Sequence, residues 1–130
     1  MKSPLFASAF FALLLVGVTN LVGIFFHLFY TINWFDMGMH FLGGFFVAVS
    51  TLAILTRHTS NFSYGQLLAW GLVSACILGI LWELFELYFH ITSLQSPSYI
   101  GDNGMDLTMD VFGGLLAVLY SYFKIRTSDH

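Results

Sequence analysis

Apolar residues fill four long segments of the chain, and most polar residues lie between these segments or near their ends. The segments cover residues 4–30, 36–56, 65–90 and 106–124. A helix that crosses the hydrocarbon core of a bilayer needs about 20 mostly apolar residues. The pattern therefore predicts an all-α, polytopic membrane protein, with four transmembrane helices that form a single domain over residues 1–130.

The composition also favours a membrane environment. Hydrophobic residues make up 58% of the chain and charged residues only 8%, whereas about a quarter of the residues in a soluble domain are charged. The lipid bilayer is thus the expected partner, and no basic, aromatic-interleaved surface for nucleic acid is present. The first apolar segment continues well beyond the length of a signal-peptide core, so we interpret it as a retained helix.

The basic residues lie near the two termini and between the second and third apolar segments. They are Lys2, Arg57, Lys124 and Arg126. Because Lys and Arg are enriched in the cytoplasmic loops of membrane proteins, both termini and the central loop are predicted to be cytoplasmic. The other two loops then face outward.

Two pairs of segments resemble each other, which indicates an internal duplication. "DMGMHFLGGFF" over 36–46 resembles "DLTMDVFGGLL" over 106–116, and "NLVGIFFHL" over 20–28 resembles "ELFELYFHI" over 83–91. Each half would be a helical hairpin, and both hairpins would run out and back in the same sense. This is a parallel repeat, whose pseudo-twofold axis is expected along the membrane normal. The halves are about 1–60 and 61–130.

Acidic residues and glycines suggest where two of the helices begin. Asp36 and Asp106 open the helices predicted over 36–56 and 106–124, where a carboxylate meets the positive end of the helix dipole. Gly101 and Gly104 are expected to form a turn in the preceding loop.

Each of these two helices also carries a glycine pair, Gly43-Gly44 and Gly113-Gly114. Small residues let membrane helices approach closely, so the two helices are predicted to cross near these pairs at the centre of the bundle. Glycine-rich faces of this kind also allow a homo-oligomer.

Ionisable side chains within membrane helices are costly and usually face the interior of the bundle. Asp36 and His40 are four residues apart, and so are Asp106 and Asp110, so each pair shares one helix face. Within each pair the second residue lies about 6 Å deeper than the first, from the helical rise per residue.

The helix over 65–90 adds a third polar face. Glu83, Glu86 and His90 share this face, and His90 is expected at the outer rim together with His27. Because this helix runs antiparallel to the helix of His40, the polar faces converge on the outer third of the membrane. The predicted metal ligands are Asp36, His40, Glu83, Glu86, Asp106, Asp110 and His90.

Clustered carboxylates repel one another unless they take up protons or bind a cation. A mixture of carboxylates and imidazoles suits Zn, Mn or Fe rather than Mg or Ca, so a divalent metal ion is the expected cofactor. Two alternatives remain open at this point. The residues could form a protonated relay for protons or cations, or a purely structural network of hydrogen bonds between the helices.

Three functions are consistent with these interpretations of the polar cluster. The first is a metal-dependent membrane hydrolase that acts on a lipid-linked or envelope substrate, with Glu83 or Glu86 as the catalytic general base. The second is a homo-oligomeric cation transporter or channel that uses the same acidic cluster. The third is an accessory or structural membrane protein.

Three motifs also resemble a known family. They are "D-x-x-x-H-F-x-x-G" over 36–44, "W-E-L-F-E" over 82–86 and "G-D-N-G-M-D-x-x-x-D" over 101–110. In this order they resemble the YjdF-like proteins of the bacterial inner membrane and, more remotely, the VanZ-like family, whose link to glycopeptide resistance implies envelope chemistry. The resemblance implies the same location for this chain and the importance of five residues, without specifying a reaction. These are Asp36, His40, Glu83, Asp106 and Asp110.

Overall fold

The computed structural model describes residues 3–32, 34–57, 61–89 and 99–128. These residues are helical apart from short turns and connections, which confirms the all-α prediction for this part of the chain. The helices are α1 (Phe6–Phe25), α2 (Leu28–Thr31), α3 (Phe35–Leu55), α4 (Tyr64–Tyr88) and α5 (Tyr99–Ser128).

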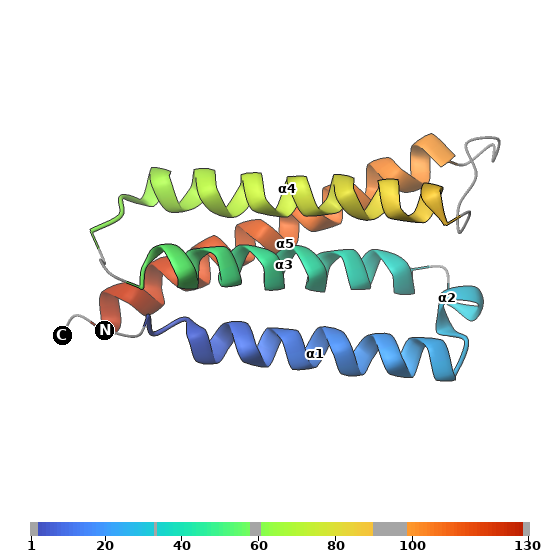
Figure 1. The fold of residues 1–130 in the computed structure, drawn as a ribbon, viewed down its shortest axis with the longest axis horizontal. Coiled ribbons are helices and arrows are strands. Elements are labelled where there is room, and N and C mark those ends of the chain that lie inside the picture. The colour runs from blue at the N-terminus through green and yellow to red at the C-terminus, as the bar shows by residue number, and fades with distance from the viewer. Residues whose placement is uncertain (1–2, 33, 58–60, 90–98, 129–130) are drawn as a thin grey trace.

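The long helices form an up-and-down bundle (Figure 1). Helices α1 and α4 run in one direction, and α3 and α5 run in the other, with α5 lying obliquely along α3 and α4. Helix α3 is central, because it packs against α1, α4 and α5. The starts of α3 and α5 therefore lie at the same end of the bundle as the C-terminal end of α4.

Three of the described helices are long and apolar enough to cross a membrane: α1, α3 and α4, with 20, 21 and 25 residues. Helix α5, with 30 residues, is long enough but not apolar enough, and its N-terminal half carries three aspartates. The sequence prediction of a membrane protein is thus supported for three spans.

The prediction of a first helix over residues 4–30 is wrong, because the helix in the structure is shorter. Helix α1 ends at Phe25, because His27 adopts a left-handed backbone conformation with φ of 56°. This conformation is costly for a residue with a Cβ atom and stops the helix. The chain then forms the single turn α2, whose Phe29 ring lies 4.9 Å from the Phe35 ring at the start of α3.

The prediction that the fourth helix covers residues 106–124 is wrong about its start, because the helix in the structure begins earlier. Helix α5 starts at Tyr99, so Gly101 and Gly104 are helical and do not form the expected turn. Asp102 lies in the first helical turn, where a carboxylate is favourable. Asp106 therefore lies inside the helix, and a role at the helix start does not explain it, whereas Asp36 does lie in the first turn of α3.

The predicted crossing of the glycine pairs is confirmed. A Cβ atom on Gly44 would collide with the backbone carbonyl of Asp110, and one on Gly113 would collide with the backbone carbonyl of Phe41. Gly114 faces α4 instead, where a Cβ atom would lie 3.0 Å from Ala75. Close approach of α3 and α5 fixes their register, and this register determines which polar side chains meet.

Candidate metal centre

His40 is the centre of the polar site. It lies on α3, its exposed fraction is 6%, and both ring nitrogens face carboxylates of α5. The Nδ1–H group donates a hydrogen bond of 3.1 Å to Asp110 Oδ2, while Nε2 lies 4.0 Å from Asp106 Oδ2. An ionised carboxylate only accepts hydrogen bonds, so the bond to Asp110 assigns the proton to Nδ1 and leaves Nε2 with a free lone pair when the ring is neutral.

Asp110 occupies a space that glycines provide. Its exposed fraction is 5%. A Cβ atom on Gly79 of α4 would lie only 2.5 Å from Asp110 Oδ2, while one on Gly43 of α3 would lie 3.9 Å from Oδ1, an ordinary contact distance. The carboxylate is thus enclosed between α3 and α4, which holds it against the His40 ring.

Asp36, His40 and Asp106 form the group with the geometry of a metal site. Each side chain can offer one ligand atom, and the three atoms lie within 4.8 Å of one another. Ligand atoms about 2.1 Å from a shared metal are separated by roughly 3.0–4.2 Å, for angles between about 90° and 180° at the metal. The 4.0 Å separation of His40 Nε2 and Asp106 Oδ2 falls in this interval, and the ligand atom of Asp36 lies within 4.8 Å of the other two.

Glu83 on α4 is close to this group. The charges of His40, Asp106 and Asp36 all act on its carboxylate. Both carboxylate oxygens are buried and have no hydrogen-bond partner among the described residues. A carboxylate without partners is unfavourable in a dry environment, so this group calls for a cation or a proton.

Glu86 lies at the rim of the cluster. The Trp82 Nε1–H group, one helical turn earlier, donates a hydrogen bond of 3.0 Å to Glu86 Oε1. Asp36 and His40 lie near enough for their charges to act on the Glu86 carboxylate. The Trp82 ring stacks on Phe85 at 5.3 Å, which fixes the donor.

The remaining polar candidates lie elsewhere or outside the described residues. His90, a predicted ligand, lies outside the described residues. His27 is exposed at the turn between α1 and α2 and is not part of the candidate group of Asp36, His40 and Asp106. Asp102 is exposed in the first turn of α5, one turn before Asp106.

Sequence reasoning missed two residues that shape the site. Gly79 makes room for Asp110, and its signal was its position four residues before Glu83, on the same helix face. Trp82 was interpreted only as part of an interfacial aromatic belt. Its spacing of four residues from Glu86 was the signal for the hydrogen bond.

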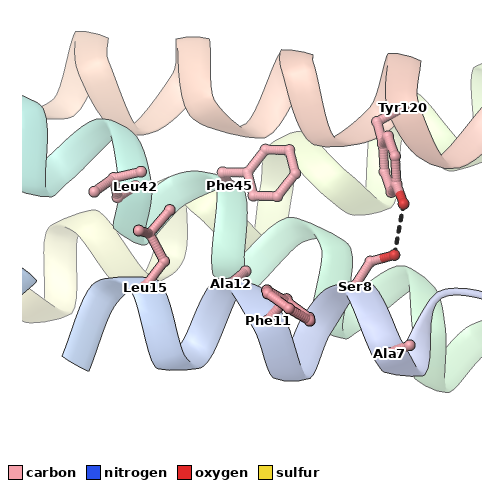
Figure 2. Close-up of a pocket in the computed structure, with 8 residues that line it drawn as sticks. All are labelled: Ala7, Ser8, Phe11, Ala12, Leu15, Leu42, Phe45 and Tyr120. Carbon is pink, nitrogen blue, oxygen red and sulfur yellow. Dashed lines mark hydrogen bonds between the residues drawn. The ribbon is translucent and has the colours of Figure 1, made fainter. Parts of the chain in front are cut away.

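A separate apolar groove lies between α1, α3 and α5 (Figure 2). It has a volume of about 410 Å³ and is lined by residues such as Ala12, Leu42 and Phe45. A 2.6 Å hydrogen bond between Ser8 Oγ and Tyr120 Oη closes one side. The groove contains none of the carboxylates or imidazoles of the acidic cluster, so its lining suits lipid tails rather than ions.

Comparison with known proteins identifies the family but no characterised relative. A family model described as "Predicted membrane protein (DUF2238)" matches residues 2–127. No curated protein and no solved structure gave a significant match. The family match agrees with the resemblance to YjdF-like proteins, and it gives no support to the remoter VanZ-like resemblance. Because the match covers nearly the whole chain, the protein belongs to the DUF2238 family of predicted membrane proteins.

Proposed function

We propose that the protein binds a divalent metal ion through His40, Asp36 and Asp106, and that it hydrolyses an ester or phosphate bond in a lipid-linked or envelope substrate. One observation carries the metal site. His40 is held by Asp110 through Nδ1, while Nε2 is directed at Asp106. Metal-binding histidines commonly donate their other ring N–H group to a carboxylate in this way.

The donor set favours particular metals and roles. One imidazole with several carboxylates suits Zn, Mn or Fe better than Mg or Ca, which prefer oxygen ligands alone. In this proposal Asp110 does not bind the metal but positions the ring of His40. Glu83, whose buried oxygens have no hydrogen-bond partner in the part of the chain that the structure describes, is the general base in this proposal.

The chemistry follows from these roles. A bound divalent metal would lower the pKa of a water molecule and polarise the scissile carbonyl or phosphoryl group. Glu83 would accept a proton from the attacking water and return it to the leaving oxygen as the ester bond breaks. Glu86, oriented by Trp82, would hold a polar group of the substrate at the rim. The predicted roles of Glu83 and Glu86 are thereby separated into base and positioning group.

The proposed architecture is a bundle of four membrane helices in the bacterial inner membrane, with both termini cytoplasmic. Helix α5 would be the fourth span, because it packs along α3 and α4 and its aspartates Asp106 and Asp110 are buried among them. Arg57, Lys124 and Arg126 follow the end of α3 or lie near the end of α5, as expected for a cytoplasmic face. The two parallel hairpins would be α1 with α3 and α4 with α5.

Packing beneath the site argues against a pathway for ions through a single copy. The described core of α3 and α5 beyond the crossing consists largely of small apolar residues. Ala48, Val49, Leu52, Ala117 and Val118 are each fully buried there. These five residues offer a cation no polar group, so transport would require several copies around a shared pathway.

Metal analysis of the purified protein tests the proposal. After incubation with Zn²⁺, Mn²⁺ or Fe²⁺ and removal of excess ion, we expect about one metal per chain by plasma mass spectrometry. His40→Ala and Asp106→Asn should lose the metal. Asp102→Asn should retain it, because this exposed carboxylate lies one turn away on the same helix. A wild-type protein that retains none of these metals would overturn the metal site.

A second experiment tests the hydrolase reading. Metal-loaded protein in lipid nanodiscs is assayed with fluorogenic phosphate and carboxylate esters that carry one acyl chain. Glu83→Gln should abolish turnover while metal content stays at the wild-type level if Glu83 is the base. If the protein has its full metal content but turns over neither class of ester, the metal site is supported and the proposed hydrolase activity is rejected.

A further inference from the structure

A cavity of about 430 Å³ lies at the opposite end of the bundle from the acidic cluster. It is formed by the connection that precedes α4, the first turn of α4 and the last turns of α5. Phe62, Leu67 and Ile125 supply apolar walls, while Asn61 and Arg126 supply polar groups. Leu67 and Ile125 are 2% and 5% exposed, so the apolar floor belongs to the packed core.

The guanidinium of Arg126 is held in a defined position at this cavity. Its Cζ atom lies 4.5 Å from the centroid of the Tyr122 ring, within the range of a cation–π contact. The Tyr122 ring in turn packs edge-on against Tyr64, with centroids 5.2 Å apart. Among the described residues Arg126 forms no ion pair with a carboxylate. The guanidinium carries five N–H donors in a planar fork, a geometry that suits a phosphate.

The charge of the molecule is divided between the two ends of the bundle. The described basic residues, Arg57, Lys124 and Arg126, lie at the end with this cavity. The described acidic residues lie toward the other end, at the starts of α3 and α5 and the last turns of α4. The described charged residues at this end are thus all basic, which favours an anion over a cation in the cavity.

We propose that this cavity binds the phosphate group of an anionic phospholipid. Arg126 would form charge-assisted hydrogen bonds with the phosphate oxygens, and the glycerol and upper acyl chain would contact Phe62, Leu67 and Ile125. The cavity lies at the end of the bundle where α3 ends and α4 begins, which for membrane-spanning helices is the level of the headgroups. The apolar walls favour a lipid over free phosphate, since free phosphate gains nothing from them. The proposal does not depend on the metal centre.

Lipid titration of the full-length protein in detergent, read by native mass spectrometry, tests this site. Phosphatidylglycerol is compared with phosphatidylcholine, and Arg126→Gln is compared with Arg57→Gln. Arg57 supplies the matched control, because it carries the same charge at the same end but does not line the cavity. We expect Arg126→Gln to weaken binding of phosphatidylglycerol about tenfold or more, as for loss of hydrogen bonds to a charged group. Arg57→Gln should weaken it by at most about fivefold.

Two further measurements complete the test. Tyr122→Phe should retain the lipid affinity, because the ring face remains, whereas Tyr122→Leu should lower it. Soluble glycerol phosphate at millimolar concentration should not displace the lipid. Equal effects of Arg126→Gln and Arg57→Gln, or equal retention of phosphatidylcholine, would overturn the proposal. Displacement by glycerol phosphate would assign the cavity to a soluble phosphate ligand instead.

Discussion

Substitution of Gly79 by alanine tests how Asp110 acts on the site. The new Cβ atom would lie 2.5 Å from Asp110 Oδ2 and 3.1 Å from Asp110 Cγ. A relaxed contact between carbon and oxygen is about 3.3 Å, so the oxygen has to move by about 0.8 Å. This oxygen is the acceptor of the 3.1 Å hydrogen bond from His40 Nδ1. Gly79→Ala should therefore break or weaken that bond without any change to a proposed metal ligand.

The expected size of the effect differs between metal affinity and stability. Loss of the carboxylate that orients a metal-binding histidine lowers metal affinity by about 10- to 100-fold, which corresponds to about 1.4–2.7 kcal/mol. The lost hydrogen bond costs about 1.5–3 kcal/mol of folding free energy. Alanine returns up to about 1 kcal/mol through its higher helix propensity. The net destabilisation should thus be about 0.5–2 kcal/mol.

Gly43→Ala is the matched control, because its Cβ atom would lie 3.9 Å from Asp110 Oδ1, an ordinary contact. Zinc affinity is measured by competition with a chelating dye in detergent, and stability by thermal unfolding of the metal-free protein. Gly43→Ala should keep wild-type zinc affinity. If Gly79→Ala binds zinc as tightly as Gly43→Ala does, Asp110 does not position His40, and the proposed role is refuted.

Two other predictions concern the helix crossing and pH. Gly113→Ala should lower the free energy of unfolding in detergent by about 1–3 kcal/mol, because its Cβ atom would collide with the Phe41 carbonyl. Gly17→Ala is the control. Its Cβ atom would have nothing within 4 Å, so it should not destabilise the protein in the same assay. Imidazole and carboxylate bind metals only when unprotonated, so zinc affinity should fall as pH is lowered from 7 to 5, by up to about tenfold per pH unit for each displaced proton. A pH-independent affinity would exclude His40 and the carboxylates as ligands.

The sequence was most informative where a residue's position depends on its own helix. Spacing of four residues placed Asp36 with His40 and Asp106 with Asp110, and the structure brings these faces together. The glycine pairs predicted the crossing because close approach needs small residues whatever the partner. These features depend on local periodicity and side-chain size, which are present in the sequence itself.

The sequence was least informative where the answer depends on the register between helices. It treated Asp106 and Asp110 as equivalent ligands, although only Asp110 hydrogen-bonds to Nδ1 of His40. The early start of α5 was hidden by Gly101 and Gly104, whose low helix propensity is outweighed in the folded chain. The left-handed backbone of His27 was also missed, since a residue with a Cβ atom rarely adopts it.

Exchange of the two partners, His40→Asp with Asp110→His, separates a structural pair from a metal centre. The two residues occupy equivalent positions in the repeated motifs, and their side chains hydrogen-bond to each other. His40→Asp alone places two carboxylates side by side and should destabilise the bundle, because like charges in a buried site repel. The double exchange restores one imidazole and one carboxylate, so thermal stability should recover toward the wild-type value.

Metal binding should not recover with it. In the exchanged protein the imidazole projects from α5 toward α3, so Nε2 no longer faces Asp106, and its distance to Asp36 changes as well. We therefore expect restored unfolding temperature with zinc affinity at least about tenfold below the wild type. Recovery of both properties would mean that metal binding requires one imidazole and one carboxylate here, whichever helix carries each. The wild type could instead bind no metal while the double exchange restores stability. That result would establish the pair as a purely structural contact.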